Sequence, residues 1–129
     1  MSKKTLKVLF LYYLPLLAWM GVIFYLSSVP GLKTGAIIPV EIIFRKLAHL
    51  FEYALLSFLF WRVFHNVWGV GVFKASIFSF TATVLYAFTD EFHQYFVENR
   101  AGRLQDVALD SLGGLLGVIL SKNFFAAKS

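Results

Sequence analysis

Four stretches of the chain are apolar over lengths that fit a membrane-spanning helix. Such a helix needs about 20 mostly apolar residues to cross the hydrocarbon core of a bilayer. The stretches have expected boundaries of about 8–28, 45–64, 75–96 and 104–120. The segments between them are short and leave no room for a separate soluble domain. The pattern therefore predicts an all-α integral membrane bundle of four transmembrane helices, forming a single domain over residues 1–129.

The composition supports this prediction. The chain is 59% hydrophobic and 15% charged, whereas soluble domains are roughly 45–50% apolar and about 25% charged. A chain this short buries only about two-thirds of its surface on folding, so a soluble version would expose wide apolar patches. The net charge of +5 does not come from a basic patch, so we expect no nucleic-acid partner. The expected partner is the lipid bilayer.

The first predicted helix contains Pro15. A membrane helix tolerates proline when a neighbouring group satisfies the carbonyl that the proline leaves without a donor. An alternative interpretation of this segment is a signal peptide, preceded by a basic stretch. The apolar run is longer than the roughly 7–15 residues of a signal-peptide core, which favours a retained helix.

Basic and acidic residues are distributed unequally between the two ends of these predicted helices. If the N-terminus is cytoplasmic, the inner side holds only basic residues: Lys3, Lys4, Lys7, Arg62, Lys74, Lys122 and Lys128. The outer side then holds the remaining basic residues, Lys33, Arg45, Lys46, Arg100 and Arg103. It also holds every acidic residue: Glu41, Glu52, Asp90, Glu91, Glu98, Asp106 and Asp110. Because cytoplasmic loops are enriched in lysine and arginine, this bias predicts that both termini are cytoplasmic.

Three polar stretches that are distant in the sequence meet at the outer surface in this topology. The second helix begins there, the third ends there and the fourth begins there, which brings together residues 45–53, 89–96 and 100–110. An ionised group at bilayer depth costs at least about 2.5–3.5 kcal/mol, so the carboxylates should face the bundle interior or a wet cavity. We therefore predict one polar site built from three helices.

The titratable residues of this predicted site recur at helical spacing. His49 and Glu52 share a face of the second helix, and Asp90 and His93 share a face of the third. The candidates for acid–base chemistry are His49, Glu52, Asp90, Glu91, His93, Asp106 and Asp110. The candidates for substrate binding are Lys46, Tyr53, Gln94, Arg100 and Arg103. The alternative is a structural ion-pair network that fastens the helices together without chemistry.

A metal site is a further alternative for the same residues. His49 with Glu52, or Asp90 with His93, gives the i, i+3 pair that metal sites in helical bundles use. The sequence has no H-E-x-x-H motif and no cysteine, and the arginines around the cluster would compete with a cation. We therefore predict no metal ligands. The sequence identifies no cofactor.

The fourth predicted helix carries a G-x-x-x-G pair, Gly113 and Gly117. Small residues at this spacing allow close helix packing in membranes. Asp106 and Asp110 lie on the same helix face, so the packing stripe should direct these two carboxylates inward. The same stripe is also a candidate surface for a homo-oligomer.

In combination, these motifs resemble a known family. They are Arg45-Lys46-x-x-His49-x-x-Glu52-Tyr53, Asp90-Glu91-x-His93-Gln94, and Arg100 followed by Asp106, Asp110, Gly113 and Gly117. This order is similar to that of the VanZ-like family of small bacterial membrane proteins, over about residues 45–120. The chain departs from the family at Asp110, which is often Asn there, and at Glu98-Asn99, where members often have Pro-Gly.

The resemblance implies a multi-pass protein of the bacterial cytoplasmic membrane, linked to low-level resistance to the glycopeptide teicoplanin. Teicoplanin acts on cell-envelope precursors outside this membrane, which agrees with an outward-facing site. The resemblance does not settle a biochemical activity.

Two classes of function fit these observations. The first is an enzyme acting on a lipid-linked or anionic envelope substrate, in which His49 or His93 transfers a proton. Arg100 and Arg103 would hold a phosphate or carboxylate through forked hydrogen bonds. The second is a non-enzymatic binding or permeability protein whose charged cluster is a structural ion-pair network. The sequence does not decide between them.

Overall fold

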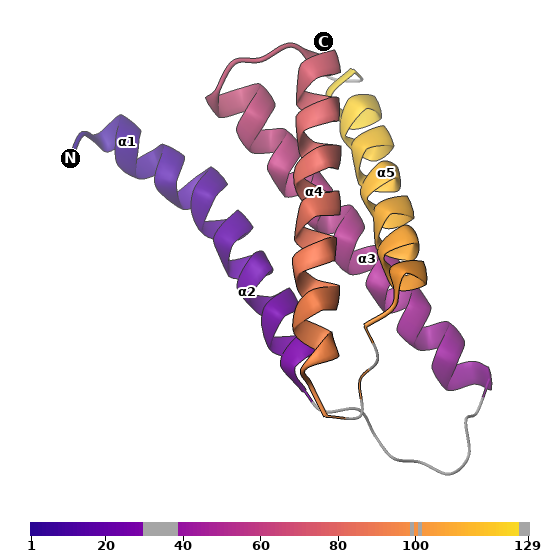
Figure 1. Ribbon diagram of the computed structural model, residues 1–129. Helices are drawn as coiled ribbons and strands as arrows, with labels where there is room; N and C mark the ends of the chain where they lie inside the picture. Colours follow the sequence, from indigo (N-terminus) through magenta and orange to yellow (C-terminus); the bar gives the residue numbers. More distant parts are fainter. Residues whose placement is uncertain (30–38, 99, 101, 127–129) are drawn as a thin grey trace.

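Every regular element that the structure describes is a helix (Figure 1). The computed structural model describes residues 1–29, 39–98, 100 and 102–126. The elements are α1 (Lys3–Val8), the π-helical η1 (Leu9–Tyr13), α2 (Leu14–Ser28), α3 (Pro39–Arg62), the π-helical η2 (Val63–Val67), α4 (Val72–Tyr95) and α5 (Leu104–Ala126). They form four continuous helices that are long and apolar enough to cross a membrane. The four predicted spans are thereby confirmed.

The helices extend beyond most of the predicted boundaries. The first begins at Lys3 rather than at residue 8, because the Ser2 side chain caps it by accepting a hydrogen bond from the backbone N–H of Thr5 at 3.1 Å. The second begins at Pro39 rather than at residue 45. Proline is favourable in a first turn, where its missing N–H would have no helical partner. The fourth continues to Ala126 rather than ending at residue 120. An apolar stretch in the sequence marks only the part of a helix within the membrane core, and the helices continue beyond that part.

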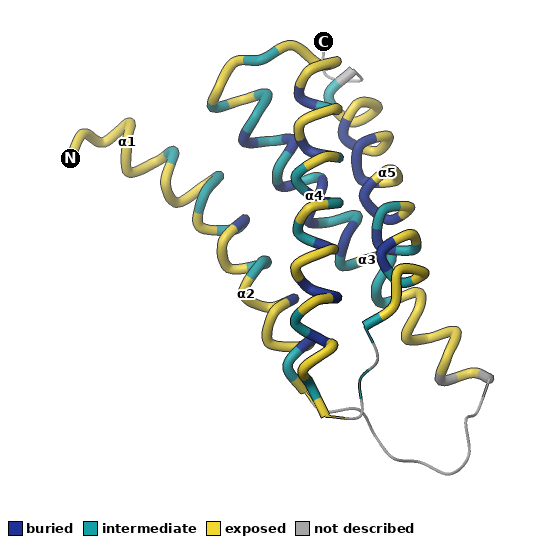
Figure 2. The backbone as a smooth tube through the Cα atoms, in the orientation of Figure 1, coloured by how far each residue is buried: buried dark blue, intermediate teal, exposed yellow. Residues whose placement is uncertain are grey.

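Three helices form the packed part of the molecule. Figure 1 shows α3, α4 and α5 together, while the chain at α1 diverges from them. The buried residues lie along the facing sides of α3, α4 and α5, and α1 is almost entirely exposed (Figure 2). α3 begins, α4 ends and α5 begins at one end of this bundle, which we call the site end. The topology therefore gathers the three predicted polar stretches as expected.

Glycines on α5 set its close approach to α3. A Cβ added at Gly113 would lie 2.7 Å from the carbonyl oxygen of Leu50, and one at Gly117 would overlap the carbonyl of Ala54. The predicted close packing of the G-x-x-x-G stripe is confirmed. Because α3 covers the stripe within the chain, a homo-oligomer would have to form through another surface.

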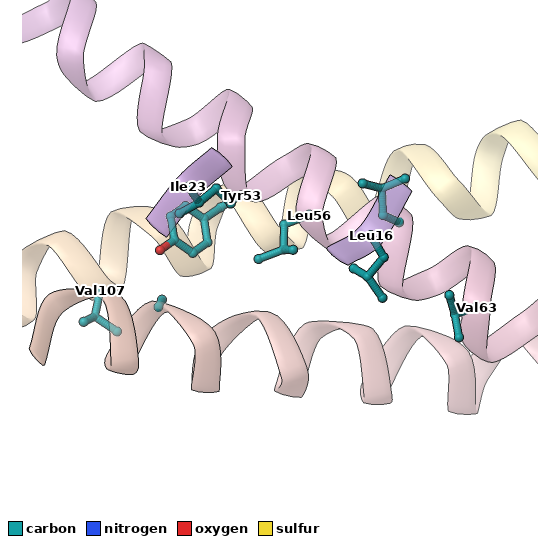
Figure 3. Close-up of a cluster of buried hydrophobic side chains, with 8 residues drawn as sticks. Leu16, Ile23, Tyr53, Leu56, Val63 and Val107 are labelled. Atoms are coloured by element: carbon teal, nitrogen blue, oxygen red, sulfur yellow. The ribbon is translucent and has the colours of Figure 1, made fainter. Parts of the chain in front are cut away.

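The first span is held to the bundle by α2. Leu16 and Ile23 of α2 join Tyr53 and Leu56 of α3 in a buried cluster (Figure 3). The indole N–H of Trp19 also donates to the backbone carbonyl of Glu52 at 2.9 Å. Together, these side-chain and backbone contacts hold α2, the second part of the first span, against α3.

Pro15 leaves the carbonyl of Leu11, four residues earlier, without its helical donor. The Arg62 guanidinium donates to this carbonyl at 3.1 Å and lies over the ring of Tyr12, 4.9 Å from its centroid. The prediction that a neighbour satisfies the freed carbonyl is confirmed. Arg62 thereby links the end of α3 to the π-helical turn η1.

Candidate functional site

A group of buried and partly buried polar side chains lies at the site end, within the helices that are apolar enough to span a membrane. It is built from His49 and Tyr53 on α3, Asp90, Glu91 and Gln94 on α4, and Asp110 on α5. We call these six residues the carboxylate cluster. Its three carboxyl groups are each at least 95% buried. The expectation that the carboxylates face the bundle interior is confirmed for Asp90, Glu91 and Asp110, whereas Glu52 is only half-buried.

His49 and Asp110 form the contact between α3 and α5. Nδ1 of His49 lies 3.0 Å from Oδ1 of Asp110. The Asp110 side chain is fully buried, whereas the His49 side chain is 19% exposed. The close approach at Gly113, one turn further along α5, brings the two helices near enough for this contact. The imidazole is therefore held on one edge by a buried carboxylate and reaches the surface elsewhere.

Asp90 is held from two sides. The Tyr53 hydroxyl donates to its Oδ2 at 2.9 Å, from α3. The Gln94 amide donates to the same oxygen at 3.3 Å, from the next turn of α4. The buried face of α4 consists of residues at about four-residue spacing, among them Ser79, Thr83 and Asp90. Because Asp90 lies on this face, its side chain points into the bundle.

Glu91 is oriented by the segment that leads into α5. Its Oε2 accepts a hydrogen bond from the backbone N–H of Arg103 at 3.1 Å. Just before this residue, a Cβ added at Gly102 would overlap the carbonyl oxygen of Glu91 and lie 3.3 Å from the backbone nitrogen of Tyr95. Glycine at position 102 therefore permits the chain to pass against the last turns of α4.

Each carboxylate has one oxygen held by these donors and one without a partner. The buried oxygens Asp90 Oδ1, Glu91 Oε1 and Asp110 Oδ2 have no hydrogen-bond partner among the described residues. One oxygen from each of the three side chains lies within 4.8 Å of the others. Buried polar atoms are nearly always hydrogen-bonded in folded proteins, so an unpartnered oxygen on each of three neighbouring carboxylates needs a physical explanation.

His93 lies outside the carboxylate cluster. Its Nε2 shares a 2.9 Å hydrogen bond with the hydroxyl of Ser28, and its ring stacks on Phe24 with centroids 4.4 Å apart. These contacts direct it towards α2. Helical spacing predicts His93 beside Asp90, but the side chain turns to the neighbouring helix instead.

Two other predicted acid–base residues lie at the edge of the cluster. Glu52 is half-buried and interacts electrostatically with His49, Asp90 and Asp110. Asp106 is also half-buried and lies within electrostatic range of Glu91 and Asp110. Both add negative charge around the cluster.

The basic residues predicted to bind a substrate do not neutralise the three buried carboxylates. Arg100 donates from Nε to the carbonyl of Val29 at 3.0 Å and from Nη2 to that of Leu26 at 3.3 Å, so it caps the end of α2. Arg103 is exposed and offers its backbone N–H to the cluster. Lys46 is exposed. Of the residues that the structure describes, His49 is the one basic side chain within ion-pair distance of these carboxylates.

Sequence reasoning did not identify Gly102 and Ser28 as parts of this region. The glycine between Arg100 and Arg103 was a usable signal, because a glycine in a tight connection marks close approach of backbones. Ser28 had no such signal, since only the packing of α2 on α4 brings it to His93.

Comparison with known proteins identifies a family. The sequence model of a family described as VanZ/LLP1 matches residues 10–125. Neither a curated protein nor a solved structure matches the chain significantly.

Proposed function

The chain belongs to the VanZ/LLP1 family, and from this premise we propose that it is an enzyme of the bacterial cytoplasmic membrane. Its substrate class is an anionic, lipid-linked component of the cell envelope, reached from the outer leaflet. His49 transfers a proton to or from the headgroup of that substrate. The observation that carries this proposal is the contact between the partly exposed His49 and the fully buried Asp110.

A histidine held in this way is suited to proton transfer. Asp110 occupies Nδ1, so Nε2 is the nitrogen that exchanges a proton with a substrate. A carboxylate on the far side of an imidazole fixes its tautomer and stabilises the charged form, as in hydrolytic triads. A positioned acid or base accelerates a reaction by about 10²–10⁴-fold.

The charge distribution argues against a purely structural ion-pair network. Such a network holds helices together when each buried charge has an opposite charge beside it. Arg100 binds backbone carbonyls of the first span, and the Arg103 and Lys46 side chains are exposed. The three buried carboxylates therefore lower the stability of the folded protein, and carboxylates of this kind inside a membrane typically mark a functional site.

Basic side chains at the site end suit an anionic headgroup. Arg103 lines an open surface hollow with Leu104 and Gln105, at the start of α5. Lys46 is exposed on the first turns of α3, at the same end of the bundle. A guanidinium binds phosphate or carboxylate through two parallel hydrogen bonds. These residues would hold the headgroup while His49 exchanges a proton.

The test is turnover of envelope lipids by the purified chain in nanodiscs, followed by mass spectrometry. The wild type should convert a lipid-linked species, and His49→Gln should lower the rate by at least about 100-fold. His65→Gln is the matched control, because His65 lies in η2 at the opposite end and bonds the carbonyl of Val70. Gel filtration of each variant checks that it remains folded. Equal rates for both variants would contradict the assignment of His49.

The family resemblance adds a cellular test. Expression of the chain in a teicoplanin-susceptible bacterium should raise the concentration of teicoplanin needed to stop growth. His49→Gln should remove this effect at equal protein levels. Resistance that survives this substitution, without lipid turnover in vitro, would favour the non-enzymatic binding role instead.

A further inference from the structure

We propose that Asp90, Glu91 and Asp110 bind one hard divalent cation, of the class of Mg²⁺, Mn²⁺ or Ca²⁺, between α4 and α5 at the site end. The site itself stands on the geometry of the carboxylate cluster. Only the role of the ion rests on the proposed function.

The carboxylates are arranged as ligands rather than as hydrogen-bond partners of one another. One oxygen of each is held by the protein: by Tyr53 and Gln94 for Asp90, by the Arg103 N–H for Glu91, and by His49 for Asp110. The other oxygen of each is buried without a partner among the described residues. Metal ligands typically have this arrangement, in which outer donors fix the orientation of the side chain that binds the ion.

The donors do not come from one helix turn. Asp90 and Glu91 follow each other on α4, and Asp110 comes from α5, so the three side chains approach from different directions. Their side chains are at least 95% buried, and one oxygen of each lies within 4.8 Å of the others. Two ligands on opposite sides of Ca²⁺, at bond lengths of 2.3–2.6 Å, are about 5 Å apart, and adjacent ligands are closer. The spacing therefore fits a shared ion with small adjustments.

The chemistry of the donor set selects the class of ion. All three ligands are carboxylate oxygens, which suit Mg²⁺, Mn²⁺ and Ca²⁺. Nδ1 of His49 is engaged by Asp110, and His93 is directed to Ser28. The imidazoles therefore do not complete the pairs with Glu52 or Asp90 that the sequence offered as metal ligands. The expectation of no metal ligands rested on the missing H-E-x-x-H motif, the absence of cysteine and competition from arginines. Carboxylate ligands for a hard cation need neither that motif nor a thiolate, and the Arg100 side chain binds carbonyls of the first span.

Charge supplies the driving force for binding. Three carboxylates in a low-dielectric interior strongly disfavour being ionised together. His49 can offset one negative charge, and a divalent cation would offset the other two. For the proposed function, the bound ion would let an acidic site accept an anionic headgroup, with its remaining coordination positions open to phosphate oxygens.

Direct binding of Mn²⁺ tests the site. The purified chain in phosphatidylcholine nanodiscs is titrated with Mn²⁺ alone, and free Mn²⁺ is measured by electron paramagnetic resonance. The wild type should bind one Mn²⁺ per chain, which Mg²⁺ or Ca²⁺ displaces. Asp90→Asn combined with Glu91→Gln should remove this binding. Glu98→Gln, an exposed carboxylate in the turn after α4, is the matched control and should bind as the wild type does.

A second variant keeps the inference testable if the double substitution does not fold. Tyr53→Phe removes the hydroxyl that orients Asp90 but no ligand, and it should weaken Mn²⁺ binding by about 10–100-fold.

Thermal stability gives an independent readout. Divalent cation should raise the unfolding temperature of the wild type but not that of Glu91→Gln, and in chelator Glu91→Gln should be the more stable of the two.

Two outcomes would overturn the inference: no stoichiometric Mn²⁺ binding by the wild type, or undiminished binding by the folded double variant. A cluster that shares protons instead would give the first outcome. These measurements need no lipid substrate, so a wild type that binds Mn²⁺ without turning over lipid contradicts only the proposed function. Turnover in the presence of chelator, without Mn²⁺ binding, contradicts only the cation site.

Discussion

The Tyr53 hydroxyl and the Asp90 carboxylate join α3 to α4 through a 2.9 Å hydrogen bond inside the bundle. Tyr53 is fully buried, and its ring packs in the apolar cluster with Ile23 and Leu56 (Figure 3). The same side chain therefore belongs to the apolar core by its ring and to the carboxylate cluster by its oxygen. Packing of the spans and orientation of the acids depend on each other at this residue.

This shared role predicts that Tyr53→Phe lowers stability. The substitution keeps the ring in the core and removes one hydrogen bond to a buried carboxylate, a loss of about 1.5–3 kcal/mol. The free energy of unfolding, measured in mixed detergent micelles without divalent cation, checks this value. Tyr25→Phe is the control, since Tyr25 is 68% exposed. If the two variants unfolded at the same denaturant concentration, the hydrogen bond would have no net role in stability.

The glycine stripe predicts a second effect on stability. Gly117→Ala places a methyl group against the carbonyl of Ala54 and 2.9 Å from Cβ of Ser57, so α5 must move away from α3. Overpacking of this kind typically costs about 1–3 kcal/mol. Gly21→Ala is a control in a neighbouring span, because nothing lies within 4 Å of the added Cβ. Thermal unfolding should show a clear loss for Gly117→Ala and no loss for Gly21→Ala.

The same displacement should reach the site. Movement of α5 away from α3 would lengthen the contact between His49 and Asp110. Gly113→Ala, where the added Cβ would lie 2.7 Å from the Leu50 carbonyl, should therefore lower lipid turnover as well as stability. A variant that lost stability but kept the wild-type rate would show that the site tolerates this shift.

Arg62 and Pro15 should be energetically coupled. Arg62→Ala leaves the carbonyl of Leu11 without a donor, and the loss of one such hydrogen bond typically costs about 0.5–1.5 kcal/mol. Pro15→Ala restores a backbone N–H at the position that serves this carbonyl in a regular helix. We therefore expect Arg62→Ala to destabilise the wild type more than it destabilises the Pro15→Ala background. A double-mutant cycle on unfolding free energies measures the difference. Additive effects would contradict the proposed compensation.

The spans were predictable because the thickness of the bilayer's hydrocarbon core sets the length of each apolar stretch. The convergence of polar stretches followed from topology, since consecutive spans must alternate in direction. The ends of the helices were less predictable, because a capping serine at Ser2 and a proline at Pro39 act locally and add no hydrophobicity. The freed carbonyl at Pro15 was predictable, but its donor, Arg62, depended on how η1 and α3 pack.

Side-chain direction within the site was the part that spacing did not determine. Asp90 and His93 share a face of α4, yet Asp90 turns to Tyr53 and His93 turns to Ser28. A helix face in a bundle contacts two neighbours at once, and periodicity does not say which one each residue meets. Glu91 lies about 100° around the helix from Asp90. It still belongs to the cluster because the segment before α5 passes directly against it at Gly102.

The orientation of the bundle is the remaining prediction. Because the sequence has no cysteine, a single introduced cysteine is the one labelling site in this chain. Gln105→Cys lies at the exposed start of α5, at the site end, and Asn66→Cys lies exposed in η2 at the opposite end. In intact cells a membrane-impermeant maleimide should label Gln105→Cys, because the bias of lysine and arginine places the site end outside. Asn66→Cys should be labelled only after the membrane is permeabilised. The reverse pattern would place the carboxylate cluster on the cytoplasmic side, where a substrate of the outer leaflet does not reach it.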